Sequence, residues 1–263
     1  HTIKNILCAG VKICNQSSPK IGYKLKGKCN EKEKSRGIKW IIILILLLII
    51  VVAGIIIGRE IFSHKVAQQR FKDLSKEISN DSKLEEILDA LFKKNKECIG
   101  WVCIKEKAID YPVMHTPNDP RNICIKIFNG QYSSSGTPFL DARCTINSSN
   151  CILYGHNMRN GQLFASLKQY VDKSYYKKHP EVEFKTKNGD NFYKIFAVVT
   201  LNRMMNGTTS LMHQIEKFQE NITGIMEKAL YTTGVKPKFG QQLLTLSTCY
   251  GSDEDGRLIV VAK

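Results

Sequence analysis

One uninterrupted apolar run dominates the first third of the chain. Residues 40–58 read WIIILILLLIIVVAGIIIG and contain no charged side chain. At helical rise, a run of this length crosses a hydrocarbon core of roughly 30 Å. A long polar segment precedes the run and no small-residue cleavage site follows it, unlike a secretory signal peptide. The pattern therefore predicts an uncleaved transmembrane helix, and the alternative is a buried core helix.

Apolar residues keep a helical spacing immediately after this run. They recur every three or four positions through residues 59–78 and again from Leu84 to Leu91. The second stretch follows Asn80, Asp81 and Ser82, any of which suits a helix N-cap. We predict a helical stalk and a packing helix over residues 59–97.

From residue 98 the pattern changes to short β-like runs that are broken by turn signals. EVEFKT and NFYKIFAVVTL flank the turn KNGD, which is a hairpin signal. Helical spacing returns in residues 161–171, 173–179 and 211–231. Strands and helices do not alternate regularly, which favours a mostly β fold, a closed or nearly closed barrel over residues 98–263. The other runs are CIGWVCIK, IDYPVMH, NICIKIF, TPFLD, CILYGH, QQLLTLSTC and RLIVVAK.

Positive charge is concentrated before the apolar run. Residues 1–39 contain ten Lys or Arg and two Glu, a net +8 of the total +15, which leaves +7 for the rest. Cationic flanks stay in the cytoplasm, so we predict a basic cytoplasmic segment over residues 1–39 and an extracytoplasmic domain after residue 58. The basic segment has few aromatic residues and no recognisable nucleic-acid module. Anionic lipid therefore explains it better than nucleic acid.

Candidate chemistry lies in LLTLSTCYGSDEDGRLIVV, close to the end of the chain. Side chains alternate along a strand, so Thr245, Ser247 and Cys249 share one face. A hairpin closed by YGSDEDG sets Cys249 opposite Arg257, with their Cβ atoms about 5 Å apart. Arginine stays protonated and offers a fork of donors, so Arg257 suits a thiolate or an oxyanion and not the role of a base.

A thiol nucleophile needs a partner that moves protons. His156, in CILYGHNMRNG, ends an apolar run at the point where a strand gives way to a loop, which favours it as that partner. The other histidines are expected at surface or capping positions. Alternatives stay open for each group: a buried structural Cys249, an ion pair of Arg257 with the acidic turn 253–255, and a purely structural His156.

The nine cysteines give no support to a metal or redox site. No C-x-x-C pair occurs among them, which argues against a zinc ribbon or a thioredoxin-type centre. If Cys249 stays free, the remaining exterior cysteines are odd in number, which argues against a disulfide framework but leaves room for one or two bridges. The acidic run 253–255 lacks the spaced ligands of a calcium loop. We predict no metal and no organic cofactor.

Taken together, TLSTC, Arg257 eight residues later, His156 in YGHN and a single N-terminal anchor resemble the sortases, the cysteine transpeptidases of the Gram-positive cell surface. GHN after a strand, the run YSSSGTPFLD and a helix before the final cysteine strand resemble class B. The resemblance covers about residues 90–263 and implies an eight-stranded β-barrel with flanking N-terminal helices and an inserted helix. It also implies Cys249 as nucleophile, His156 as proton-transfer partner and Arg257 as the group that holds the substrate carbonyl or oxyanion.

The same resemblance implies that Ser247 binds the substrate or shapes the site. Tyr154 and Asn157 are further candidates for substrate binding, and packing and a turn role are their respective alternatives.

The function implied by the resemblance is that of a single-pass membrane enzyme. It cleaves a C-terminal sorting signal of exported proteins, LPxTG-like or NPxTN-like, through a Cys249 thioester and transfers the product to a peptidoglycan-precursor amine. One alternative is an anchored cysteine peptidase, which a strand-end cysteine followed by arginine disfavours because papain-like sites use an Asn or Asp orienter. Another is a surface module that only binds.

Overall fold

A computed structural model describes residues 30–78, 84–107, 109–119, 128, 130, 133, 135–201, 222–251 and 256–263. The chain divides into two compact units, His1–Ile56 and Ile57–Lys263. The helices are α1 (Asn30–Ile78), α2 (Leu84–Lys94), η2 (Lys105–Lys107), η3 (Phe164–Val171), α4 (Lys173–Lys178) and α6 (Ile222–Lys228). The strands are β1 (Cys98–Ile104), β2 (Ile109–Met114), β3 (Phe139–Leu140), β4 (Asn150–Tyr154), β5 (Glu181–Thr186), β6 (Gly189–Leu201), β7 (Leu243–Cys249) and β8 (Arg257–Ala262).

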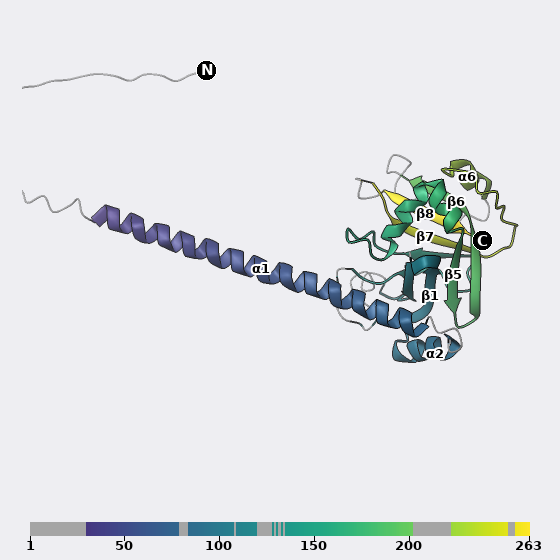
Figure 1. The fold of residues 1–263 in the computed structure, drawn as a ribbon, viewed down its shortest axis with the longest axis horizontal. Coiled ribbons are helices and arrows are strands. Elements are labelled where there is room, and N and C mark those ends of the chain that lie inside the picture. The colour runs from purple at the N-terminus through teal and green to yellow at the C-terminus, as the bar shows by residue number, and fades with distance from the viewer. Residues whose placement is uncertain are drawn as a thin grey trace, which may run out of the picture. The chain divides into compact units, whose positions relative to one another are not determined.

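The helix α1 is a single element of 49 residues that contains the apolar run (Figure 1). Its segment Gly37–Arg70 is long and apolar enough to cross a membrane, and none of its most apolar window is buried against protein. A helix that is apolar on every side and has no protein cover is typical of a lipid-facing segment.

The eight strands form a closed barrel in the order β1-β2-β3-β4-β7-β8-β6-β5, of which Figure 1 labels β1, β5, β6, β7 and β8. Neighbours are antiparallel except for β2 with β3 and β4 with β7, which are parallel. The predicted eight-stranded barrel is confirmed, and the β5–β6 hairpin pairs as its turn signal indicated. The predicted run NICIKIF covers residues 122–128, of which all but Phe128 lie outside the described residues.

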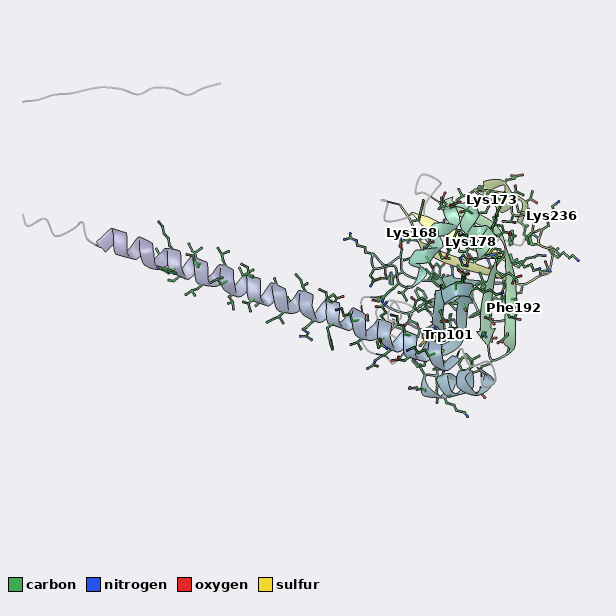
Figure 2. All side chains as sticks on the ribbon, viewed as in Figure 1. Trp101, Lys168, Lys173, Lys178, Phe192 and Lys236 are labelled. Atoms are coloured by element: carbon green, nitrogen blue, oxygen red, sulfur yellow. The ribbon has the colours of Figure 1, made fainter. Side chains whose placement is uncertain are left out.

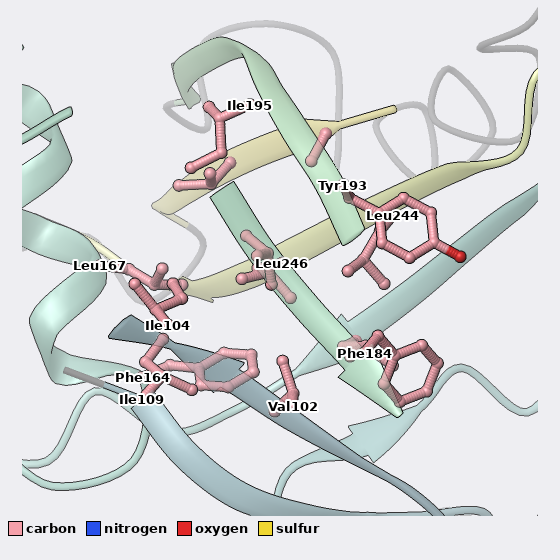
Figure 3. Packing of buried hydrophobic residues seen from close by; sticks show 14 of the residues in the cluster. Val102, Ile104, Ile109, Phe164, Leu167, Phe184, Tyr193, Ile195, Leu244 and Leu246 are labelled. Atoms are coloured by element: carbon pink, nitrogen blue, oxygen red, sulfur yellow. The ribbon is translucent and has the colours of Figure 1, made fainter. Parts of the chain in front are cut away.

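Side-chain alternation fills the barrel from every strand. Val102, Leu244 and Leu246 point into the interior together, and Phe164 and Leu167 of η3 pack against them (Figure 3). Each such fully buried apolar side chain contributes about 1.5–3 kcal/mol of transfer free energy. The 3₁₀ and α turns of η3 and α4 confirm the helical spacing of residues 161–171 and 173–179.

The opposite faces of β4, β7 and β8 are also covered. Ile152, Leu243 and Ile259 belong to a second cluster, and Ile225 and Met226 of α6 pack against it. Burial on both faces explains why these strands read as nearly continuous apolar runs and not as an alternation. The predicted helix at 211–231 is represented by α6, and its part before residue 222 lies outside the described residues.

The helix α2 covers a third apolar cluster beside β1. Leu88, Leu91 and Phe92 pack there with Trp101, whose indole Nε1 donates a 2.7 Å hydrogen bond to Asp110 Oδ1. Trp101 is labelled at this place in Figure 2. The packing helix expected before the barrel is therefore present and held by its apolar face.

Candidate active site

The hairpin of β7 and β8 brings the thiol and the guanidinium groups to one strand end. Cys249 is the last residue of β7, Arg257 is the first of β8, and the two are direct cross-strand partners. Tyr250 N donates to Gly256 O at 2.9 Å and closes the first step of the turn. The predicted register is confirmed. Directly opposed residues have Cβ atoms about 4.5–5.5 Å apart, so the two side chains leave the sheet side by side.

Parallel pairing of β4 with β7 brings His156 to the same rim. Tyr154 is the partner of Ser247, and Gly155 N continues the ladder by donating to Ser247 O at 3.2 Å. The chain segments that follow the two strands therefore leave the barrel at one edge, although they are far apart in sequence. His156 follows β4 there and is half-buried. The sequence predicted the end of each strand separately. The parallel pairing of β4 with β7 brings the two strand ends together.

Gly155 is required by a close approach just before His156. A Cβ added to Gly155 would lie 2.5 Å from Cγ of Phe164, which is itself fully buried. Phe164 N also donates to His156 O at 3.1 Å, so the first residue of η3 is hydrogen-bonded to the backbone of His156.

The substitution Gly155→Ala is expected to lower the free energy of unfolding by about 1–3 kcal/mol, the usual cost of overpacking a core. Chemical denaturation of wild type, Gly155→Ala, Phe164→Leu and the double variant measures it. Because the smaller Leu makes room for the added methyl group, the double variant is expected to be more stable than the sum of the single effects. Strict additivity would contradict the close approach.

Exposure separates Cys249 from the other cysteines that the structure describes. Burial raises the pKa of Cys98 to about 12, and it raises the pKa of Cys151 to about 12 as well. Such thiols stay protonated and are poor nucleophiles near neutral pH. Cys103 and Cys144 are half-buried, whereas Cys249 is exposed. This exposure excludes the alternative of a buried structural cysteine at position 249.

Tyr154 and Ser247 lie side by side on the same face of the sheet as Cys249. Ser247 is buried, and the Tyr154 ring packs on Phe139 with centroids 5.4 Å apart. The Tyr154 hydroxyl donates a 3.1 Å hydrogen bond to Asp141 Oδ2. Burial, together with the charge of Asp141, raises the pKa of this phenol. Tyr154 is thus packed against the sheet on the face that carries Cys249, and its hydroxyl acts as a hydrogen-bond donor.

Asp141 and Thr248 complete these contacts and were not singled out from the sequence. Burial alone would raise the pKa of Asp141, but hydrogen bonds and the charge of Arg143, with the Tyr154 hydroxyl, bring it below its ordinary value. Thr248 is buried, and its Oγ1 donates to Gly155 O at 2.8 Å. The signal for Asp141 was its place directly after TPFL, whereas nothing in TLSTC distinguishes the Thr248 hydroxyl from a packed one.

Asn157, the remaining predicted site residue, contacts the cysteine strand directly. Its Nδ2 donates a 2.9 Å hydrogen bond to Cys249 O. The described part of the chain contains no group of three or more His, Cys, Asp or Glu side chains able to hold a metal ion. The acidic turn 253–255, the proposed ion-pair partner of Arg257, lies outside the described residues.

A thiol, an imidazole and a guanidinium at neighbouring strand ends suit nucleophilic acyl transfer. Comparison with known proteins agrees with this chemistry. The Sortase domain family model matches residues 104–263. Sortase B of Listeria monocytogenes is 27% identical over 222 residues, 80% of this chain and 90% of that protein. Sortase B of Staphylococcus aureus is 26% identical over 224 residues, 77% of this chain and 90% of that protein.

A solved structure extends the likeness to three dimensions. The sortase B of Bacillus anthracis, in complex with AAEK1, is 30% identical with a TM-score of 0.55, over 67% of this chain and 83% of that one. The chain therefore belongs to the sortase family and is a cysteine transpeptidase. Within that family its relatives are sortases B, the class that the sequence resembled.

Proposed function

We propose that Cys249 is the nucleophile, that His156 is its proton-transfer partner and that Arg257 holds the substrate carbonyl and the oxyanion formed from it. The observation that carries this proposal is the direct cross-strand pairing of Cys249 with Arg257. His156 follows the end of β4, the strand that pairs with β7, and so lies at the same edge of the barrel. Cys249 is exposed there while the six preceding residues of β7 are buried. The end of β7 thus presents an accessible thiol beside a cation.

The proposed reaction conserves the number of amide bonds. The Cys249 sulfur attacks the carbonyl carbon, its proton passes to the imidazole, and the oxyanion forms beside Arg257. Collapse breaks the carbon–nitrogen bond, His156 returns the proton to the leaving amine, and a thioester remains. An acceptor amine then attacks the thioester, gives its proton to His156, and leaves as the new amide while the thiol is regenerated.

The substrate in this proposal is the sorting signal of an exported protein, LPxTG-like or NPxTN-like, and the acceptor is a peptidoglycan-precursor amine. Ser247 and Tyr154 lie at the strand ends beside Cys249 and are proposed to bind the peptide or to shape the site. Asn157 is proposed to shape the site through its hydrogen bond to Cys249 O. No metal, organic cofactor or nucleic acid takes part.

The proposed setting is the cell membrane, crossed once by residues 40–58. Residues 1–39 lie in the cytoplasm, residues 59–97 form a stalk and packing helix, and residues 98–263 form the extracytoplasmic catalytic barrel. The exposed apolar helix and the +8 charge ahead of it support this arrangement.

Peptide turnover with and without an amine tests the proposal. The full chain in detergent is incubated with LPxTG and NPxTN peptides, alone and with triglycine. We expect a thioester adduct on Cys249 by mass spectrometry and an amide product that exceeds hydrolysis when triglycine is present. Rapid hydrolysis with no amide product would instead identify an anchored peptidase.

A further inference from the structure

Two side chains join the histidine segment to the cysteine segment beyond the last regular strand pair. Thr248 Oγ1 donates to Gly155 O at 2.8 Å, and Asn157 Nδ2 donates to Cys249 O at 2.9 Å. The bonds are reciprocal, because each segment supplies one side-chain donor and one backbone acceptor. Each donor or acceptor is Cys249 itself or an immediate neighbour of Cys249 or His156. We call this pair of hydrogen bonds the clasp.

The clasp occupies the place where the β4–β7 ladder stops. The last cross-strand partners are Tyr154 and Ser247, followed by one further bond from Gly155 N to Ser247 O. His156 and Cys249 both lie beyond that point. The β4–β7 pairing ends before these two residues, and the clasp joins the two segments beyond it.

The geometry of the Asn157 side chain indicates that its NH₂ group, acting as a hydrogen-bond donor, is the part of the amide that matters at this position. A carbonyl acceptor requires the NH₂ group to face Cys249 O, which fixes the orientation of the amide. Its Oδ1 is then buried, and none of the described residues is its hydrogen-bond partner, an arrangement that costs free energy. The backbone of Asn157 is held separately by a bridge to Leu163. The Asn157 side chain is therefore not needed to fix its own segment, and it donates its hydrogen bond to the cysteine segment instead.

We propose that Asn157 and Thr248 are positioning residues that set the separation between the His156 imidazole and the Cys249 sulfur. The inference rests on the proposed roles of those two residues. Proton transfer needs the two groups within hydrogen-bond reach, and a displacement of about 1 Å in a catalytic geometry can cost roughly a hundredfold in rate. The clasp acts on the backbone of both segments and touches neither reacting atom.

Asn157→Ala is expected to lower kcat/KM for the sorting peptide by about 10- to 100-fold, through kcat and not KM. Asn157→Asp has the same shape but turns an oxygen toward the Cys249 carbonyl. At low pH its carboxyl group is protonated and can donate again. The activity of Asn157→Asp, measured relative to wild type at the same pH, is therefore expected to rise as the pH falls. A purely structural loss would not recover in this way. The isosteric Thr248→Val is expected to resemble Asn157→Ala, whereas Thr248→Ser keeps the hydroxyl and most of the activity.

The pH profile of Cys249 alkylation by iodoacetamide gives a readout that needs no peptide. The clasp variants are expected to shift this profile, because the imidazole near the thiol has moved. If Thr248→Val does not fold, the half-exposed Asn157 series carries the test. Unchanged turnover and an unchanged alkylation profile in Asn157→Ala and Asn157→Asp would overturn the clasp. Turnover retained in Cys249→Ala would instead overturn the proposed nucleophile, so the two failures are distinguishable.

Discussion

Replacing Cys249 by alanine is expected to abolish thioester formation and to lower kcat/KM by roughly 10⁴-fold or more, as loss of a nucleophile does in other covalent enzymes. Among the cysteines that the structure describes, Cys249 alone is exposed, and Cys98 and Cys151 are buried with raised pKa values. Peptide turnover and mass spectrometry of the reaction mixture measure the effect. Neither the adduct nor the amide product is expected.

The fold is expected to survive this substitution. Cys249 is exposed at the end of β7, and its cross-strand hydrogen bonds are made by the backbone. The melting temperature should therefore change by only a few degrees. Cys103→Ala is the matched control, since Cys103 is a half-buried cysteine of β1 whose loss is expected to leave turnover intact. A Cys249→Ala protein that still forms the amide would refute the proposed nucleophile.

Local periodicity was sufficient for most of the barrel and for one side of the site. The β7–β8 hairpin is a short-range structure, so alternation and an acidic turn placed Cys249 opposite Arg257 correctly. The same local reasoning predicted that a strand ends just before His156.

Non-local pairing was beyond this reasoning. β4 meets β7 in parallel although about ninety residues separate Tyr154 from Ser247, and no turn signal encodes such a pairing. The contacts that depend on it were missed for the same reason. The Thr248 bond to Gly155 and the Asn157 bond to Cys249 exist only once the two strands are neighbours. The sequence thus indicated the candidate groups, while the supporting hydrogen bonds required the fold.

The sequence left Tyr154 with two possible roles, packing and substrate binding. An aromatic residue at the end of an apolar strand packs in most folds, and Tyr154 does pack on Phe139. Its hydroxyl, however, binds Asp141, which is itself held by Arg143. Asp141 has a lowered pKa, so its contribution to stability is present above the ordinary carboxyl pKa and is lost as the pH falls through the lowered value. The packing of this face therefore weakens only under strongly acidic conditions.

Removing the guanidinium group in Arg257→Ala is expected to lower kcat by about 10²–10³-fold with little change in KM, the usual cost of losing one oxyanion donor. Arg257 is half-buried at the start of β8 beside Cys249, where charge develops on the carbonyl oxygen in the proposed mechanism. Its Nη1 donates to Gly256 O at 2.9 Å, which holds the side chain along the turn. Steady-state kinetics with the sorting peptide and triglycine separate kcat from KM.

Arg257→Lys distinguishes the role of charge from the role of geometry. Lysine keeps the positive charge but replaces a planar fork of donors by a single ammonium group. If Arg257 holds the oxyanion through directed hydrogen bonds, the lysine variant recovers only part of the lost kcat. An ion pair with the acidic turn, the alternative raised by the sequence, requires only the charge. In that case both variants would keep the wild-type kcat, Arg257→Ala would lower the melting temperature, and Arg257→Lys would restore it.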